Sequence, residues 1–253
     1  MKRYKKPYEL KNMAKDTLQG KYGAAVLILF LYNLITGLVS MFISLLASTT
    51  SATAYAMTES SSVVTVITIV FEIISFAAVA VLRIMEAGIT LFFLNIACNQ
   101  PYAINNLFHG FSKDSSGKTL TLSIVWGLCS TVCLYPYQYC FSAYWNSRDI
   151  RMLYITLIVM AVGICVYVPI YLSLSQIFYL MLDYPDLSAK EILALSIRVM
   201  KGNKGRLFYL NLSFVPMMIL GLLSFGIGFL WLNPYMRMTG AYFFLDMMKP
   251  AEE

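Results

Sequence analysis

Long runs of apolar residues, separated by short polar stretches, constrain this chain more than any other feature. The first run extends from Gly23 to Ala47, and a helix needs only about 20 apolar residues to cross a bilayer. Charged residues make up 13% of the chain, against about 25% in soluble domains. Water cannot cover so much apolar surface at low cost. The sequence therefore predicts an all-α membrane protein with a retained first span.

The apolar runs predict six transmembrane helices. In chain order they are Gly23–Ala47, Val63–Leu82, Leu120–Phe141, Leu153–Leu182, Leu207–Phe225 and Phe229–Met247. The second run continues to Cys98, which as helix would measure about 50 Å against about 30 Å of hydrocarbon. We therefore expect its crossing to end at Arg83. The rest of the run would continue as a surface helix or as one long tilted helix.

Basic residues gather on one side of these predicted spans. Sixteen of the 19 Lys and Arg residues lie on the side that holds both termini, and Arg83 would lie at the surface of that side. The opposite side has only Arg148 and Arg151. Basic loops stay in the cytoplasm, so we expect both termini to be cytoplasmic. The net charge of +6 suits anionic phospholipid headgroups as partners and requires no nucleic acid.

The chain also repeats one plan three times within a single membrane domain, residues 1–253. The predicted units are about 7–101, 102–185 and 187–250, and each has an amphipathic helix followed by two crossings. The predicted opening helices are 7–19, 102–111 and 188–200, and the third begins with Ser188-Ala-Lys-Glu191, a capping box. The units end in similar triplets: Phe92-Phe93-Leu94, Phe178-Tyr179-Leu180 and Phe243-Phe244-Leu245. Each unit crosses the membrane twice and so returns to the side on which it began. The predicted helical hairpins are therefore parallel copies of one another.

Two segments resemble the signature of a bacterial membrane family, the domain-of-unknown-function 975 family. They are Met200-Lys-Gly-Asn-Lys-Gly-Arg-Leu-Phe208 and Gly226-Ile-Gly-Phe-Leu-Trp-Leu-Asn-Pro-Tyr235. The stretches Ala14–Gly23 and Leu182–Glu191 are similar to the family as well, whereas Tyr135-Pro-Tyr-Gln departs from its usual turn. The resemblance implies a multi-pass protein of the bacterial plasma membrane. It implies no activity and no catalytic residue.

Two polar positions inside the apolar runs are candidate sites. Glu72 lies near the middle of the second run, where a charge is costly and points to function. We expect it to form an intramembrane polar site with Asn33 and Asn211, or to stay neutral within the bundle. Arg83 and Glu86 are three residues apart and so share a helix face. They predict an interfacial ion pair, with a headgroup clamp as the alternative.

Two further segments carry weaker signals. The first is a candidate anion or headgroup site at a helix start, formed by Lys201, Asn203, Lys204 and Arg206; a simple turn with snorkelling basic side chains is the alternative. The second segment predicts a break in the sixth span, because a proline within a helix leaves a backbone carbonyl without its usual hydrogen-bond partner. The break would line a cavity or make a packing kink. Its residues are Gly226, Gly228, Trp231, Asn233, Pro234 and Tyr235.

The sequence has no constellation typical of catalysis or metal binding. The five cysteines form no CxxC pair and His109 is the only histidine, so we expect no metal and no cofactor. We expect a non-enzymatic membrane protein that handles an amphipathic or lipid-like ligand, or the membrane component of an export or envelope system with a partner subunit. The alternatives are a small transporter or channel using Glu72 and the broken sixth helix, and a lipid-modifying enzyme.

Overall fold

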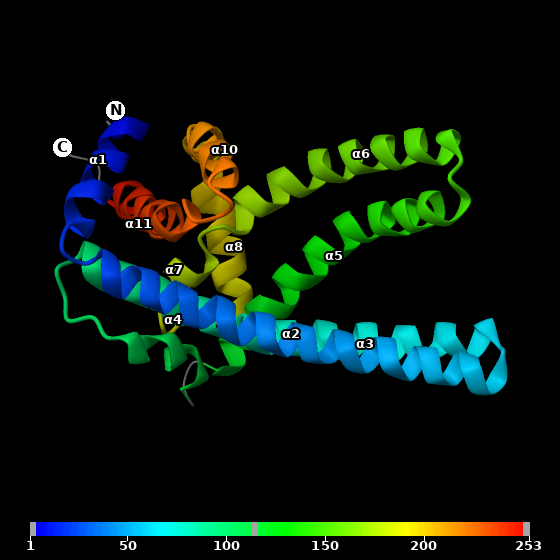
Figure 1. Cartoon of the computed structure of the whole chain (residues 1–253). Helices are drawn as coiled ribbons and strands as arrows, with labels where there is room; N and C mark the ends of the chain where they lie inside the picture. The colour runs from blue at the N-terminus through cyan, green and yellow to red at the C-terminus, as the bar shows by residue number, and fades with distance from the viewer. Residues whose placement is uncertain (1–3, 113–115, 250–253) are drawn as a thin grey trace.

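The computed structural model describes residues 4–112 and 116–249, and helices dominate both ranges (Figure 1). No strand occurs in these ranges. Five helical stretches are long and apolar enough to cross a membrane by length and composition. They are Tyr22–Thr58, Ser62–Ala97, Ser116–Ser147, Ile150–Asp183 and Lys204–Leu223. The predicted all-α membrane class is confirmed to this extent.

Two long helical hairpins project from a common base. Helices α2 (Tyr22–Thr58) and α3 (Ser61–Leu82) form the first, and α5 (Ser116–Ser147) and α6 (Ile150–Leu174) form the second. The hairpins touch through α3 and α5 and diverge toward their tips (Figure 1). Their apolar side chains face outward, and Leu38, for example, is 58% exposed. In a bilayer such side chains contact acyl chains instead of water.

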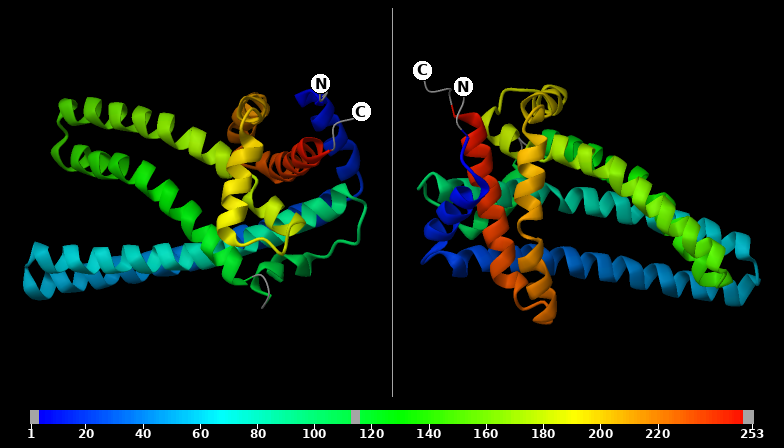
Figure 2. Two further views of the ribbon diagram at one scale, coloured as in Figure 1. Left: turned by 180° about the vertical axis from the view of Figure 1, so that it is seen from behind. Right: turned by 90° about the horizontal axis from the view of Figure 1, so that it is seen from above.

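A third hairpin consists of α9 (Lys204–Leu212), α10 (Val215–Leu223) and α11 (Phe229–Met248). Seen from above, it lies across the direction of α2 (Figure 2). The last helix, α11, is not among the five stretches that meet the length and composition of a span. The predicted count of six spans is therefore not confirmed. Helix α11 has 20 residues, enough for a crossing, but polar residues such as Asn233, Arg237 and Asp246 make it less apolar than the five stretches.

The base is built from α11 together with short helices that pack on it or on one another. They are α1 (Pro7–Leu18), α4 (Ile84–Ala97), η1 (Ile104–Phe111), α7 (Ile177–Asp183) and α8 (Ala189–Met200). Three of them, α1, η1 and α8, occupy the predicted opening segments, although η1 is a 3₁₀ helix. The apolar face of α1 is covered by protein, because Leu10, Ala14 and Leu18 are buried and α1 packs on α11, α4 and α9.

Helix α8 begins with the capping box that the sequence predicts. The Ser188 hydroxyl accepts a hydrogen bond from the Glu191 amide, and the Glu191 carboxylate accepts one from the Ser188 amide at 2.8 Å. The Ser188 hydroxyl also donates to the Glu191 carboxylate at 2.7 Å, and this bond, with the one from the Ser188 amide, holds the pKa of the Glu191 carboxyl below its ordinary value. The two capping bonds satisfy two of the amides that a helix start leaves without partners, and so fix the point where the chain enters α8.

Aromatic residues of the three similar triplets meet in the core of the base. Phe92, Phe93, Phe243 and Phe244 are almost fully buried. The Tyr179 ring stacks on Phe244, with centroids 5.0 Å apart. The triplets lie near the C-terminal ends of α4 and α11 and in the first half of α7.

Helices α4 and η1 approach each other closely at a glycine. A Cβ added to Gly88 would lie 2.3 Å from the Asn106 carbonyl oxygen and 2.4 Å from that of Leu107. Backbone atoms cannot move aside as flexible side chains do, so only glycine fits at this position.

We predict that Gly88→Ala lowers the free energy of unfolding by about 1–3 kcal/mol, because overpacking forces the two backbones apart. The matched control is Gly37→Ala on α2, where an added Cβ meets nothing within 4 Å; it should be neutral or slightly stabilising. Thermal unfolding of the purified protein in detergent measures both. Equal melting temperatures for the two variants would contradict the close packing of α4 and η1.

Candidate functional site

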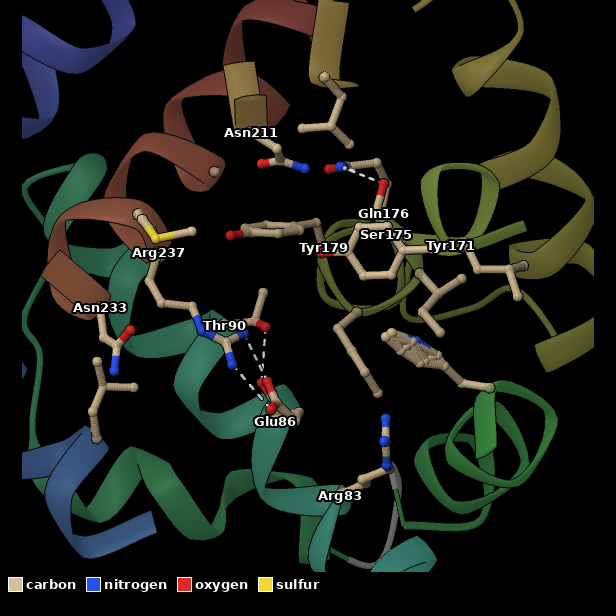
Figure 3. Close-up of a pocket in the computed structure, with 18 of the residues that line it drawn as sticks. Arg83, Glu86, Thr90, Tyr171, Ser175, Gln176, Tyr179, Asn211, Asn233 and Arg237 are labelled. Carbon is tan, nitrogen blue, oxygen red and sulfur yellow. Dashed lines mark hydrogen bonds and ion pairs between the residues drawn. The ribbon is translucent and has the colours of Figure 1, made fainter. Parts of the chain in front are cut away.

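A polar cavity of about 420 Å³ lies where the three hairpins meet the base (Figure 3). All three hairpins contribute to its wall, together with α4, α7 and the joint between α6 and α7. Its polar lining residues are Tyr32, Asn33, Arg83, Glu86, Thr90, Tyr171, Ser175, Gln176, Tyr179, Asn211, Asn233 and Arg237. Ligand pockets typically measure about 300–1,000 Å³, so this cavity has the size of a binding site.

An ion pair between α4 and α11 forms one wall of the cavity (Figure 3). The Arg237 guanidinium donates to both carboxylate oxygens of Glu86, at 2.8 and 3.0 Å. This two-bond geometry is the strongest that arginine makes with a carboxylate. The Glu86 side chain is only 17% exposed, whereas Arg237 is 41% exposed, which leaves part of the guanidinium open to the cavity.

The predicted ion pair between Arg83 and Glu86 is wrong. Arg83 lies at the joint between α3 and α4, and its guanidinium stacks over the ring of Trp126 on α5, 4.8 Å from the centroid. Within the described residues, no carboxylate lies within ion-pair distance of Arg83. Its side chain points into the cavity (Figure 3). Arg83 and Glu86 both line the cavity, but Glu86 forms its ion pair with Arg237, 151 residues further along the chain.

Two side-chain amides face each other at another end of the cavity. Gln176, at the break between α6 and α7, is 3% exposed and points toward Asn211 of α9 (Figure 3). The Gln176 amide nitrogen donates to the Ser175 hydroxyl at 3.0 Å, while its oxygen has no hydrogen-bond partner. A buried acceptor without a donor costs free energy, so this oxygen marks a place where a ligand or water would be favourable.

The predicted cluster of Glu72, Asn33 and Asn211 does not form. Asn33 and Asn211 both line the cavity, but Glu72 is exposed on the outer surface of α3 and is not part of the lining. The residues that the sequence analysis missed are Gln176 and Arg237. Arg237 carried a usable signal, because a charge within an apolar run is costly and requires a partner.

The predicted anion site around Arg206 is largely occupied by the protein itself. Arg206 pairs with the buried carboxylate of Asp246 at 2.7 Å and donates to Asn203 at 3.1 Å. The Lys5 amide also donates to Asp246, at 3.2 Å. Lys201 is exposed and Lys204 half-buried. This cluster therefore ties the N-terminal segment to α9 and α11 and leaves Arg206 with little capacity for an external anion.

The predicted break in the sixth span lies before α11, not within it. Helix α11 runs without interruption through Pro234, and the turn is made at Gly226, whose φ is +87°. Gly228 packs against the Gly221 backbone, 2.8 Å from the position of an added Cβ. Trp231 is exposed and Tyr235 contacts Phe214 edge-on. Of this motif, Asn233 lines the cavity.

No group of three His, Cys, Asp or Glu side chains able to hold a metal ion occurs in residues 4–112 and 116–249. The cysteines there are all free thiols. His109 lies in η1, away from the cavity lining.

One comparison with known proteins gave a match. A family model described as "Protein of unknown function (DUF975)" matches residues 1–251. Neither the curated proteins nor the solved structures contain a match to this chain.

We predict that Glu86→Gln or Arg237→Gln alone lowers the free energy of unfolding by roughly 1–3 kcal/mol, since each leaves its partner without compensation. The double variant should cost less than the sum of the two single variants. Unfolding in detergent, with all four proteins measured under one condition, gives the coupling energy. Strictly additive losses would show that the pair does not contribute as a unit.

Proposed function

The chain belongs to the DUF975 family of proteins of unknown function, and from that premise we propose that it binds an amphipathic, lipid-like ligand without catalysing a reaction. The polar head of the ligand would occupy the cavity beside Arg83 and the Glu86–Arg237 pair. The same activity would suit a component of an export or envelope system that acts with a partner membrane subunit.

The position of the cavity carries this proposal. A polar chamber lies where two hairpins with apolar outer surfaces begin to diverge, and Trp126 and Tyr171 stand at its edge, 5.8 Å apart by ring centroids. A molecule with a polar head and an apolar tail fits such a boundary, because the head keeps hydrogen bonds while the tail stays among apolar side chains.

We also propose a location in the bacterial plasma membrane with both termini in the cytoplasm. The basic residues on the side of the two termini support this orientation, as does the family resemblance. We also propose a membrane topology of six crossings in three parallel hairpin repeats. The hairpin of α9, α10 and α11 lies across the direction of α2 (Figure 2), so this topology requires that hairpin to turn toward the direction of α2.

The alternatives receive less support. A channel built on Glu72 loses its motivating residue, because Glu72 lies outside the cavity lining. A lipid-modifying enzyme needs an available acid or base, whereas the carboxylate in the cavity, Glu86, is held by two bonds from Arg237.

Filling the cavity tests the proposal. Gly240 of α11 lines it, and an added Cβ would meet only the Tyr179 hydroxyl at 3.4 Å, so Gly240→Leu should fill the space without disturbing the backbone. We predict at least about a tenfold loss of affinity for a fluorescent phospholipid, the equivalent of 1.4 kcal/mol.

The matched control is Gly37→Leu, which adds the same side chain at an exposed position of α2 and should bind like the unmodified protein. Melting temperatures of both variants confirm that they are folded. Unchanged lipid binding by folded Gly240→Leu would rule out the cavity as the binding site.

A further inference from the structure

Given the proposed function, we infer that the head of the ligand is both anionic and hydroxylated, as in a phosphate that carries a glycerol-like substituent. The inference deepens the proposed site by naming the chemistry that it recognises. It rests on the charge balance of the cavity and on the unpartnered oxygen of Gln176.

The cavity has one uncompensated positive charge. Its charged lining residues are Arg83, Glu86 and Arg237, and the last two neutralise each other through two hydrogen bonds. Arg83 then remains without a carboxylate. The Arg83 side chain is half-buried, and a half-buried guanidinium without a carboxylate partner favours an anion.

The stacking of Arg83 leaves its donors available for this purpose. The guanidinium carbon lies over the Trp126 ring, 4.8 Å from its centroid, and a cation–π contact of this kind uses none of the hydrogen bonds that the N–H groups can donate. These N–H groups match the oxygens of a phosphate in a two-bond arrangement. Trp126 thus orients Arg83, and Arg83 is the residue that touches the anion.

The two amides require a different group on the ligand. The Gln176 oxygen lacks a donor, and Asn211 faces it at the same end of the cavity (Figure 3). A hydroxyl both donates and accepts, so it can serve the Gln176 oxygen and the Asn211 amide at once. A trimethylammonium head has no N–H or O–H to donate, and its positive charge would face Arg83.

The volume agrees with a small head. The cavity measures about 420 Å³, near the lower end of the range of about 300–1,000 Å³ typical of ligand pockets. A glycerol phosphate has about ten non-hydrogen atoms and suits a pocket of this size, whereas two acyl chains are too large for it. The chains would leave the cavity along the apolar surfaces of the hairpins.

The test compares three phospholipids with identical acyl chains, using the full chain in detergent and native mass spectrometry to measure binding. Phosphatidylglycerol has the anion and the hydroxyls, and phosphatidic acid has the anion without the glycerol hydroxyls. Phosphatidylcholine has a phosphate whose charge is balanced by its trimethylammonium group, and it has no hydroxyl. We expect phosphatidylglycerol to bind about threefold to tenfold more tightly than phosphatidic acid. Phosphatidylcholine should bind at least about tenfold more weakly than phosphatidylglycerol.

Variants assign these preferences to residues. Arg83→Gln should remove the preference for anionic lipids, and Arg83→Lys should keep part of it. Gln176→Met should abolish the difference between phosphatidylglycerol and phosphatidic acid. The matched control is Arg148→Gln, because Arg148 also stacks on a tryptophan, Trp145 at 3.9 Å, but lies between α5 and α6 at the tip of their hairpin.

The outcomes separate this inference from the proposed function. If phosphatidylcholine binds as tightly as phosphatidylglycerol and Gly240→Leu abolishes both, the cavity binds lipids but the head assignment is wrong. If no lipid binding depends on Gly240, the proposed function fails as well. If soluble glycerol phosphate binds as tightly as the lipid, the head chemistry holds and the requirement for an apolar tail is overturned.

Discussion

The ion pair between Glu86 and Arg237 is the contact on which the arrangement of the base and the cavity depends. It joins α4, which follows the first hairpin, to α11, the last helix of the chain. In an apolar environment neither charge is tolerable alone, so the two helices must approach in one register. That register also places Arg237 beside the space that Arg83 and Gln176 line. Because the pair satisfies its own charges, the cavity keeps only the positive charge of Arg83.

The rest of the molecule divides into a base held together by protein contacts and hairpins whose apolar side chains are exposed. In the base, Asp246 joins the N-terminal segment to Arg206. The Lys11 ammonium donates to the Ser213 carbonyl at 2.8 Å and lies over the Phe214 ring, and burial lowers the pKa of Lys11. The two long hairpins touch through α3 and α5 and diverge beyond that contact (Figure 1). Their divergence therefore leaves apolar surface beside the polar cavity, which is the geometry that an amphipathic ligand requires.

Local sequence patterns predicted the structural features that depend only on neighbouring residues. The apolar runs predicted the long helices, and Ser188-Ala-Lys-Glu191 predicted the start of α8, because span length and capping depend on neighbouring residues. The ion pair of Arg83 was predicted wrongly, since spacing along one helix cannot reveal a competitor such as Arg237 from far along the chain. The prediction for Glu72 used only its depth within the predicted span, and this depth does not tell which side of α3 faces the cavity. Gln176 gave no signal, because only the break between α6 and α7 makes it a buried acceptor.

The most direct measurement is photocrosslinking in living cells, with the photoreactive amino acid benzoylphenylalanine in place of one tyrosine at a time. Tyr171 lines the cavity, whereas Tyr139 is 72% exposed on the outside of the second hairpin and samples the surrounding bilayer. The account predicts that lipids captured at position 171 are enriched in anionic, hydroxylated heads relative to those captured at position 139. The same lipid composition at both positions, or no capture at position 171, would contradict it.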